Sequence, residues 1–333
     1  MIDYCCPLSD EVLRRDCDRL VGANGLSYPI VDDVPVFVDN HADDSQAQVA
    51  GSFGFKWNRG DLGHRPEQFE TFTKPAVMEA LALRDDDDIH AWIDDKLVLD
   101  AGVGSGMSAR VYGEHAAELH GVDISEAVFA ARRQLGHWLH FHPAQADLMH
   151  LPFADESFDV IVSNGVLHHT PDTQLALQAV LRKLKRGGHI LFYIYKKKTP
   201  LREFADDYIR ERISSQPPEE ALSLLAPLTK LAKAMSDLKV AVTVPEDIEL
   251  LEIPAGTHDL QRLLYYHCFK FYWNDALTFE ENNLVNFDWY HPKYAHRHTE
   301  AELRGWLTEF GCEVVRLDVM PFGMACIARK GNA

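Results

Sequence analysis

The sequence has few cysteines, no long apolar run and fewer basic than acidic residues. Six cysteines scattered over 333 residues are too few for a disulfide framework, so we expect reduced thiols. No window approaches the roughly 20 consecutive apolar residues that a membrane-spanning helix needs. The N-terminus also lacks the basic start and apolar core of a secretory signal. These absences predict a cytoplasmic protein with no membrane contact.

The balance of charge bears on the partners of the protein. Lys and Arg total 33 and Asp and Glu total 51, which gives a formal net charge of -18. Binding to phosphate backbones requires clustered Lys and Arg, so we expect no nucleic-acid partner. The hydrophobic content of 46% is sufficient for one large core with an appended subdomain.

Residues 96–198 alternate short apolar runs with amphipathic stretches. This alternation predicts right-handed βαβ units and a mainly parallel sheet. Residues 199–297 break the alternation, with helical patterns expected over 201–214, 219–238 and 259–276. A helix over 299–310 and strands at 312–319 and 325–328 are expected to close the chain.

The most informative segment runs from Leu97 to Gly106. An apolar strand ends in Asp100, and a glycine-rich turn then leads into a helix expected over 105–115. Glycines allow a sharp turn and a close approach of backbone to ligand. The turn has Gly102, Gly104 and Gly106 in the spacing G-x-G-x-G, whereas nicotinamide-binding proteins have G-x-G-x-x-G.

Three acids follow strand ends in this region. A carboxylate at Asp100 would repel a pyrophosphate but attract an ammonium group. Asp123 closes the next strand, from where an acid can hydrogen-bond ribose hydroxyls, and Asp147 can accept from an adenine amino group. Taken singly, Asp123 and Asp147 also fit ordinary surface acids. As an ordered set, the three acids favour a cationic nucleoside over a phosphorylated one.

These motifs resemble those of class I S-adenosylmethionine-dependent methyltransferases. The resemblance covers about residues 96–195 and rests on 100–106, 122–125, 147–148 with 151–153, 158–161 and 184–188. It implies S-adenosylmethionine as the cofactor. Gly102 and Gly104 would line the methionine moiety with Asp100 near its amino group, Asp123 would hold the ribose, Ile124 and Leu148 would flank the adenine, and Asp147 would meet its amino group. Gly106, Asn164, Phe55 and Trp57 complete the set of cofactor-binding candidates.

Residues 163–169 follow the fourth strand and so lie beside the expected cofactor. The segment is similar to that of small-molecule methyltransferases and lacks the Asn/Asp-Pro-Pro-aromatic motif of many nucleic-acid and protein amine methylators. His168 or His169 can serve as a base near neutral pH; a structural role is an equal alternative for each. Adjacent histidines rarely point at one ion, so we expect no metal there.

The insertion at 199–297 contains two aromatic stretches, 263–273 and 287–294, the second of which resembles a stretch of related methyltransferases. Long insertions at this edge usually cap an active site, so we expect a helical lid. Tyr265 and Tyr290 are the catalytic candidates in it, although such aromatics more often form the insertion's own core. Phe53, Phe55 and Trp57 are expected to close the other side of the pocket.

The N-terminal residues resemble a small zinc-ribbon-like family associated with methyltransferases. That family places four cysteines in two pairs, and here Ser9, Val21 and Asn24 occupy three of the positions, which leaves only Cys6. We therefore expect a degenerate module without a metal ion.

The sequence thus predicts an α/β three-layer sandwich with a mainly parallel seven-stranded sheet, a helical lid insertion and a small N-terminal β module. The expected divisions are 1–40, the degenerate module; 41–95, a helical segment covering the cofactor; 96–198, the S-adenosylmethionine-binding core; 199–297, the lid; and 298–333, the final helix and strand pair.

The predicted function is methyl transfer to a small-molecule acceptor. Two alternatives remain. Reaction at the γ-carbon of the cofactor's methionine chain would give aminocarboxypropyl transfer or cyclisation, with release of methylthioadenosine. The chain could otherwise be a noncatalytic partner subunit, although the intact glycines and acids argue against that.

Overall fold

The computed structural model describes residues 2–38, 44–58 and 68–332. Its centre is a seven-stranded sheet in the order β12-β13-β9-β8-β5-β6-β7. Every strand runs parallel to the others except β13, which pairs antiparallel with both of its neighbours. The strands are β5 (Leu97–Ala101), β6 (Glu118–Asp123), β7 (Phe141–Gln145), β8 (Phe158–Asn164), β9 (Leu184–Tyr195), β12 (Cys312–Val319) and β13 (Gly323–Lys330).

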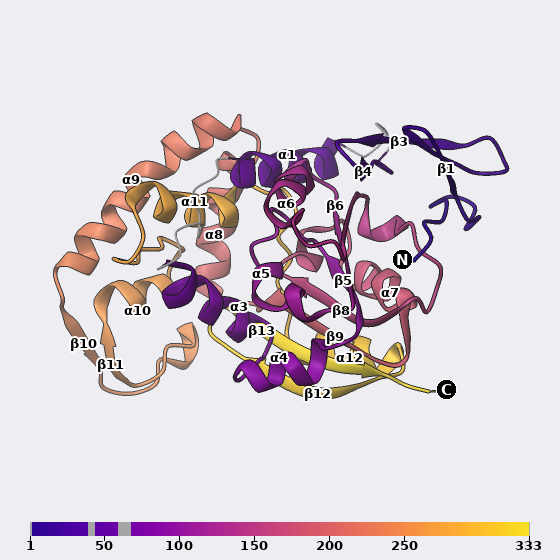
Figure 1. Ribbon diagram of the computed structural model, residues 1–333. Helices are drawn as coiled ribbons and strands as arrows, with labels where there is room; N and C mark the ends of the chain where they lie inside the picture. The colour runs from indigo at the N-terminus through magenta and orange to yellow at the C-terminus, as the bar shows by residue number, and fades with distance from the viewer. Residues whose placement is uncertain (1, 39–43, 59–67, 333) are drawn as a thin grey trace.

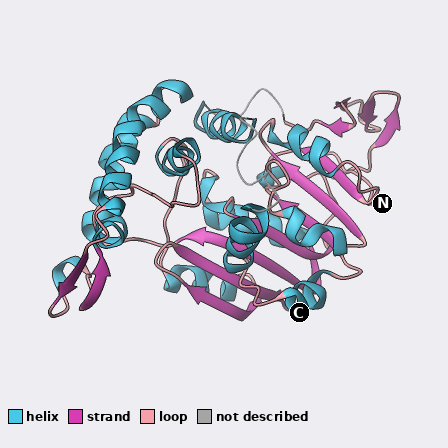
Figure 2. Ribbon diagram, turned by 60° about the vertical axis from the view of Figure 1, so that its left-hand side comes forward, coloured by secondary structure: helices cyan, strands magenta, loops and turns pink. Residues whose placement is uncertain are grey.

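Helices cover both faces of this sheet (Figure 2). Successive strand residues point to opposite faces, so Val98 and Leu99 belong to two separate apolar cores. One core packs under α3 (Lys74–Ala80), α4 (Asp86–Ile93), α5 (Ala109–Tyr112) and α6 (Ala127–Leu135). The other packs under α7 (Thr173–Lys183) and α12 (Glu300–Glu309). The predicted three-layer sandwich with a mainly parallel seven-stranded sheet is therefore confirmed.

The insertion leaves the carboxyl end of β9 and returns beside it, where Lys196 bridges to His298. It lies at one end of the sheet, opposite the N-terminal strands (Figure 1). Its elements are α8 (Pro200–Ile213), α9 (Pro218–Asp237), the hairpin of β10 (Ala241–Val244) and β11 (Gly256–Asp259), the short turn η5 (Glu249–Leu251), α10 (Leu260–His267) and α11 (Phe279–Tyr290).

Two expected helices are shorter than the sequence pattern predicts. The helix expected over 259–276 ends at His267. Cys268 N and Phe269 N still donate to the Leu264 carbonyl, but later backbone N–H groups donate to side chains of other segments. Lys270 N donates to Asp206, and Tyr272 N donates to Asn286. The helix expected over 105–115 is limited to α5 and the single turn η2 (Gly113–His115).

Helix α1 (Asp44–Asn58) joins the insertion to the core. Its Gln48 donates to the His291 carbonyl (2.8 Å), and its Ser52 hydroxyl lies 2.7 Å from His291 Nδ1. A π-helical turn, η1 (Phe69–Thr73), precedes α3. In the part of the chain that the structure describes, no helix is both long and apolar enough to cross a membrane.

The N-terminal module is a four-stranded antiparallel sheet of β1 (Arg14–Asp16), β2 (Arg19–Val21), β3 (Ser27–Val31) and β4 (Val34–Pro35). It joins the edge of the main sheet, where Phe37 N donates to Gln145 O (2.7 Å). Two of the positions compared with zinc-binding cysteines are joined by a hydrogen bond from Asn24 to Ser9 (3.0 Å). The β-rich module is present, and its kinship with zinc ribbons remains a prediction.

Candidate active site

The glycine loop between β5 and α5 forms one wall of a large cavity. Gly102 has φ +109° and Gly104 has φ +53°, which are left-handed conformations that favour glycine. A Cβ on Gly102 would lie 2.7–2.8 Å from Val166 atoms, and one on Gly104 would meet Trp57 at 3.4 Å. There is therefore no room for a Cβ at Gly102, whereas a Cβ at Gly104 would make only an ordinary contact with Trp57.

Two of the three predicted acids line this cavity. Asp123 accepts hydrogen bonds from Gly104 N (2.8 Å) and from Ser125 N (2.8 Å), and so holds the glycine loop against the end of β6. Burial raises its pKa above the ordinary value. Asp147 accepts from Gln46 (2.9 Å) and Met149 N (2.9 Å).

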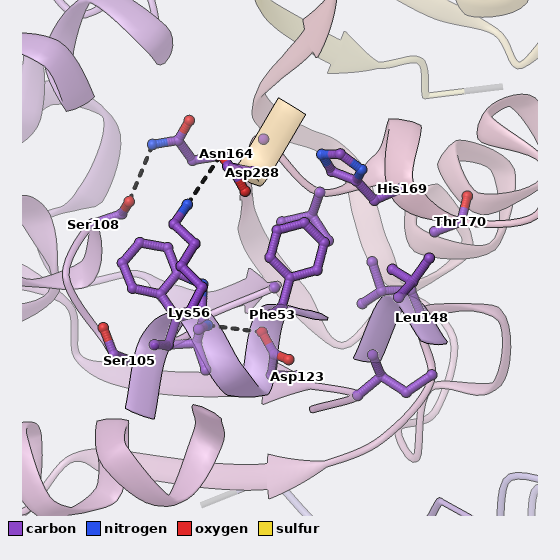
Figure 3. Close-up of a pocket in the computed structure, with 18 of the residues that line it drawn as sticks. Phe53, Lys56, Ser105, Ser108, Asp123, Leu148, Asn164, His169, Thr170 and Asp288 are labelled. Carbon is purple, nitrogen blue, oxygen red and sulfur yellow. Dashed lines mark hydrogen bonds and ion pairs between the residues drawn. The ribbon is translucent and has the colours of Figure 1, made fainter. Parts of the chain in front are cut away.

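The cavity encloses about 1120 Å³, part of it open to solvent, and lies where the carboxyl ends of the parallel strands meet. Figure 3 shows side chains from α1, the strand ends and α11 around it. The cofactor-binding candidates on its wall are Gly102, Gly104, Asp123, Ile124, Asp147, Leu148, Asn164 and Trp57.

Three other cofactor candidates lie behind the wall. Tyr112 donates to Asp100 (2.7 Å), and burial raises the pKa of Asp100 to about 7. Gly106 packs against Leu135. Phe55 turns toward Phe287 of the insertion, with ring centroids 5.5 Å apart. That these three residues contact the cofactor directly remains a prediction, and their positions behind the wall do not support it.

His169 is the catalytic candidate that reaches the cavity. Its Nδ1 lies 2.6 Å from the Tyr294 carbonyl, so Nδ1 carries a proton that it donates. Burial lowers the pKa of His169 to about 4, which keeps the ring neutral near pH 7 and leaves Nε2 unprotonated. Phe53 packs edge-on against the ring, with centroids 4.8 Å apart.

Asp288 of α11 also lines the cavity, although it is not among the site residues predicted from the sequence. Its Oδ2 forms an ion pair with Lys56 Nζ (3.0 Å). Its Oδ1 is buried and has no hydrogen-bond partner among the described residues. Burial alone would raise the pKa of Asp288, but the nearby positive charges, that of Lys56 above all, hold it below the ordinary value. The only sequence signal was an acid within the aromatic stretch 287–290.

The other three catalytic candidates lie outside this cavity. His168 is fully buried, and its ring centroid lies 3.8 Å from that of Tyr195. Burial holds the pKa of His168 well below the usual range. The Tyr290 hydroxyl donates to Asp206 (2.7 Å) inside the insertion. Tyr265 lines a second, smaller cavity. Their placement gives no support to a direct role at the cofactor.

Two groups of side chains elsewhere bring possible metal-ligand atoms within 4.8 Å of one another. One is the exposed group His90, Asp94 and His115, and the other is Glu118, His120 and His142. In both groups histidine and carboxylate are close enough to pair directly, as in His120 with Glu118 (3.2 Å). The expectation of a protein without a metal site remains a prediction.

The strand order, the single antiparallel strand and the glycine loop define a protein with the class I methyltransferase fold. Residues 99–192 match the family described as "Methyltransferase domain". The chain therefore contains a class I S-adenosylmethionine-dependent methyltransferase domain, and its cofactor is S-adenosylmethionine.

Similar proteins share this domain with the chain. An uncharacterized methyltransferase, YcgJ, of Bacillus subtilis is 33% identical over 134 residues, 38% of this chain and 52% of that protein. Phosphoethanolamine N-methyltransferase 2 of Caenorhabditis elegans is 33% identical over 104 residues, 30% of this chain and 24% of that protein. The match thus spans about a quarter to about half the length of these relatives. A 1,6-didemethyltoxoflavin-N1-methyltransferase of Burkholderia thailandensis superposes with a TM-score of 0.47 at 14% identity, covering 96% of this chain and 99% of that one.

Proposed function

We propose that the protein transfers a methyl group from S-adenosylmethionine to a small-molecule acceptor held in the large cavity. The observation that carries this proposal is the position of Asp288. Asp288 lines the cavity that the glycine loop also lines, and its buried Oδ1 has no hydrogen-bond partner among the described residues. Burial of a carboxylate oxygen without a hydrogen-bond donor costs free energy. An O–H or N–H group of the molecule to be methylated would supply that donor.

The cavity wall suits a cationic nucleoside. Asp123 and Asp147 line the cavity and would accept from hydroxyl and amino groups of the cofactor, and the glycine loop offers backbone without side chains. Two acids on the wall would repel a pyrophosphate. When bound, S-adenosylmethionine supplies an electrophilic methyl group on a positively charged sulfur.

The residues of the chain would then orient the acceptor and take its proton. Asp288 accepts a hydrogen bond from the nucleophilic O–H or N–H and aligns it. During methyl transfer, the proton released from the acceptor would pass to His169 Nε2 or to Asp288. Positioned bases of this kind contribute about 10²–10⁴-fold to rate.

Aromatic side chains would keep water out of this space. Phe53, Trp57, Tyr193 and Tyr195 line the cavity, and Lys56 lies 4.2 Å from the ring centroid of Trp57. Exclusion of water strengthens the interaction between the acceptor and the groups that orient it. A small molecule is preferred over a nucleic acid because the net charge is -18.

The first test incubates the full-length protein with S-adenosylmethionine alone and follows the nucleosides by mass spectrometry. We expect the cofactor to bind and to persist until a phenol, amine or carboxylic acid from an acceptor panel is added, when adenosylhomocysteine appears. Methylthioadenosine formed faster than the spontaneous background would contradict methyl transfer and favour reaction at the γ-carbon.

The second test uses Asp288→Asn and His169→Gln with the active acceptor. Each should lower kcat by about 10²-fold or more while the affinity for adenosylhomocysteine stays within threefold. Asp237→Asn serves as a matched control, because Asp237 is exposed and, within the described part of the chain, pairs only with Lys233 (2.6 Å). Unchanged rates in both site variants would remove these residues from the proposal.

A further inference from the structure

A second chamber lies behind the tyrosines at the end of β9. Tyr193 and Tyr195 line both the large cavity and this smaller space of about 290 Å³. The remaining walls come from the insertion and from the turn before β13. The described residues that line the chamber include three basic side chains, Lys198, Arg202 and Lys270, and no acidic one.

Lys270 is the basic residue of the chamber whose amine has no hydrogen-bond or ion-pair partner among the described residues. The residue is only 8% exposed, and its backbone N–H is held by Asp206 (2.9 Å). Its Nζ lies 4.8 Å from the Trp289 ring centroid. Within residues 2–38, 44–58 and 68–332, no carboxylate or hydrogen-bond acceptor contacts this amine. Burial lowers the pKa of Lys270 to about 7, so a bound anion would favour the protonated form.

The surrounding charges are unbalanced. Arg202 Nε pairs with Asp206 (2.7 Å), and that carboxylate also accepts from Trp289 (2.8 Å) and Tyr290 (2.7 Å). Asp206 therefore has little capacity left for a further cation. The next acid, Asp288, attracts Lys270 electrostatically, but its ion pair is formed with Lys56 on the side of the large cavity.

Lys198 increases this excess of positive charge. Its Nζ donates to the carbonyls of Pro321 (3.1 Å) and Phe322 (2.6 Å) and lies 5.5 Å from the Trp289 ring centroid. Burying cations without counterions is strongly unfavourable. In a chain of net charge -18, such a cluster beside the large cavity favours the binding of an anion.

We propose that the chamber binds an anionic group of the acceptor, a carboxylate or a phosphate, with Lys270 as its counterion. The faces of Tyr193, Tyr195 and Trp289 would pack against the neighbouring planar part of the molecule. The acceptor then extends from its nucleophilic atom beside Asp288, between the tyrosines, to an acidic end in the chamber. This inference deepens the proposed function and rests on it.

The test measures binding, so that it does not depend on turnover. The full-length protein is saturated with adenosylhomocysteine and titrated by calorimetry with benzoate, phenyl phosphate and neutral benzyl alcohol. We expect benzoate, phenyl phosphate or both to bind at least tenfold more tightly than benzyl alcohol. The anion that binds identifies the acidic group as a carboxylate or a phosphate.

Lys270→Met and Lys233→Met are compared in the same titration. Both lysines lie near a tryptophan ring, but Lys233 is exposed, 5.6 Å from the Trp273 ring centroid and paired with Asp237. Lys270→Met should weaken anion binding at least tenfold, and Lys233→Met should not. Because Lys270→Met removes a buried unpaired charge, its melting temperature without ligand should equal or exceed that of the wild type.

Several results would overturn the inference. These are equal binding of benzyl alcohol and the anions, no anion binding by the wild type, and unchanged anion binding by Lys270→Met. Loss of adenosylhomocysteine affinity in Lys270→Met would assign the lysine to the cofactor instead. Failure of the proposed methyl transfer would be seen separately, in the nucleoside products of the wild type.

Discussion

Replacement of Gly102 by alanine tests whether the glycine loop holds the cofactor by its backbone shape. Gly102 has φ +109°, where an L-residue is strained by about 1–3 kcal/mol. The added Cβ would lie 2.7 Å from Val166 Cγ1, 2.8 Å from Val166 Cβ and closer still to Cγ2. Overpacking of this kind costs about another 1–3 kcal/mol.

These two terms together amount to about 2–6 kcal/mol. A shift of the loop that relieved these contacts would break the Gly104–Asp123 hydrogen bond (2.8 Å). Because about 1.4 kcal/mol corresponds to tenfold in affinity, we expect the Kd for adenosylhomocysteine to rise at least 30-fold in Gly102→Ala. Isothermal titration calorimetry measures this directly, and urea unfolding reports the cost that appears as lost stability.

Two comparisons make the test specific. Gly51→Ala adds the same methyl group to α1, where nothing lies within 4 Å of it, so affinity should not change. Adding Val166→Ala to Gly102→Ala removes the two methyl groups but leaves the contact with Cβ, so affinity should recover only in part. A Gly102→Ala variant that binds within threefold of the wild type would refute the reasoning.

Three further predictions concern the interior and the cavity wall. Asp206→Asn should lower the free energy of unfolding by about 3–5 kcal/mol in urea titrations, because the buried Arg202 loses its counterion. Asp237→Asn, at an exposed pair, should change that free energy by less than about 1 kcal/mol. Burial lowers the pKa of His120 from about 6.5 to about 4. As pH falls from about 6.5 toward 4, His120 therefore takes up a proton in the unfolded chain but not in the folded one, which lowers the free energy of unfolding by about 2 kcal/mol at pH 5. The melting temperature of His120→Gln should decline less steeply with falling pH than that of the wild type. Trp57→Ala should raise the Kd for adenosylhomocysteine about tenfold, since about 1.4 kcal/mol of contact is lost, and Phe55→Ala, which removes a ring directed at the insertion, should leave that Kd unchanged.

The cofactor side of the site could be predicted from the sequence because each of its signals is local. A strand, a glycine turn and an acid at the next strand end are read within a few residues. Parallel strands then bring their carboxyl ends to one edge without further information. Asp123 and Asp147 therefore reach the same cavity although they belong to different βα units.

The insertion was less predictable because α11 has no apolar stripe. Its buried residues surround the whole helix and include Asn282, Asn283 and Asn286. These amides bond to other segments, as when Asn286 accepts from Tyr272 N (2.6 Å) and Asn282 accepts from Asn274 N (2.7 Å). A helix buried on all sides with polar partners gives no 3.6-residue hydrophobic period.

Which of two neighbouring candidate residues faces the cavity depends on the rotation of the helix about its axis, and the residue types alone do not define that rotation. Asp288 and Tyr290 are two steps apart on α11, so their side chains point about 200° apart. With Asp288 on the cavity wall, Tyr290 must face inward, where it meets Asp206. The turn η4 (Leu167–His169) separates His168 from His169 by about 120°, so one ring reaches the cavity and the other is buried. In each of these two pairs, therefore, one side chain faces the cavity and the other does not. Which one faces it is decided by how the helical turn packs against the rest of the protein.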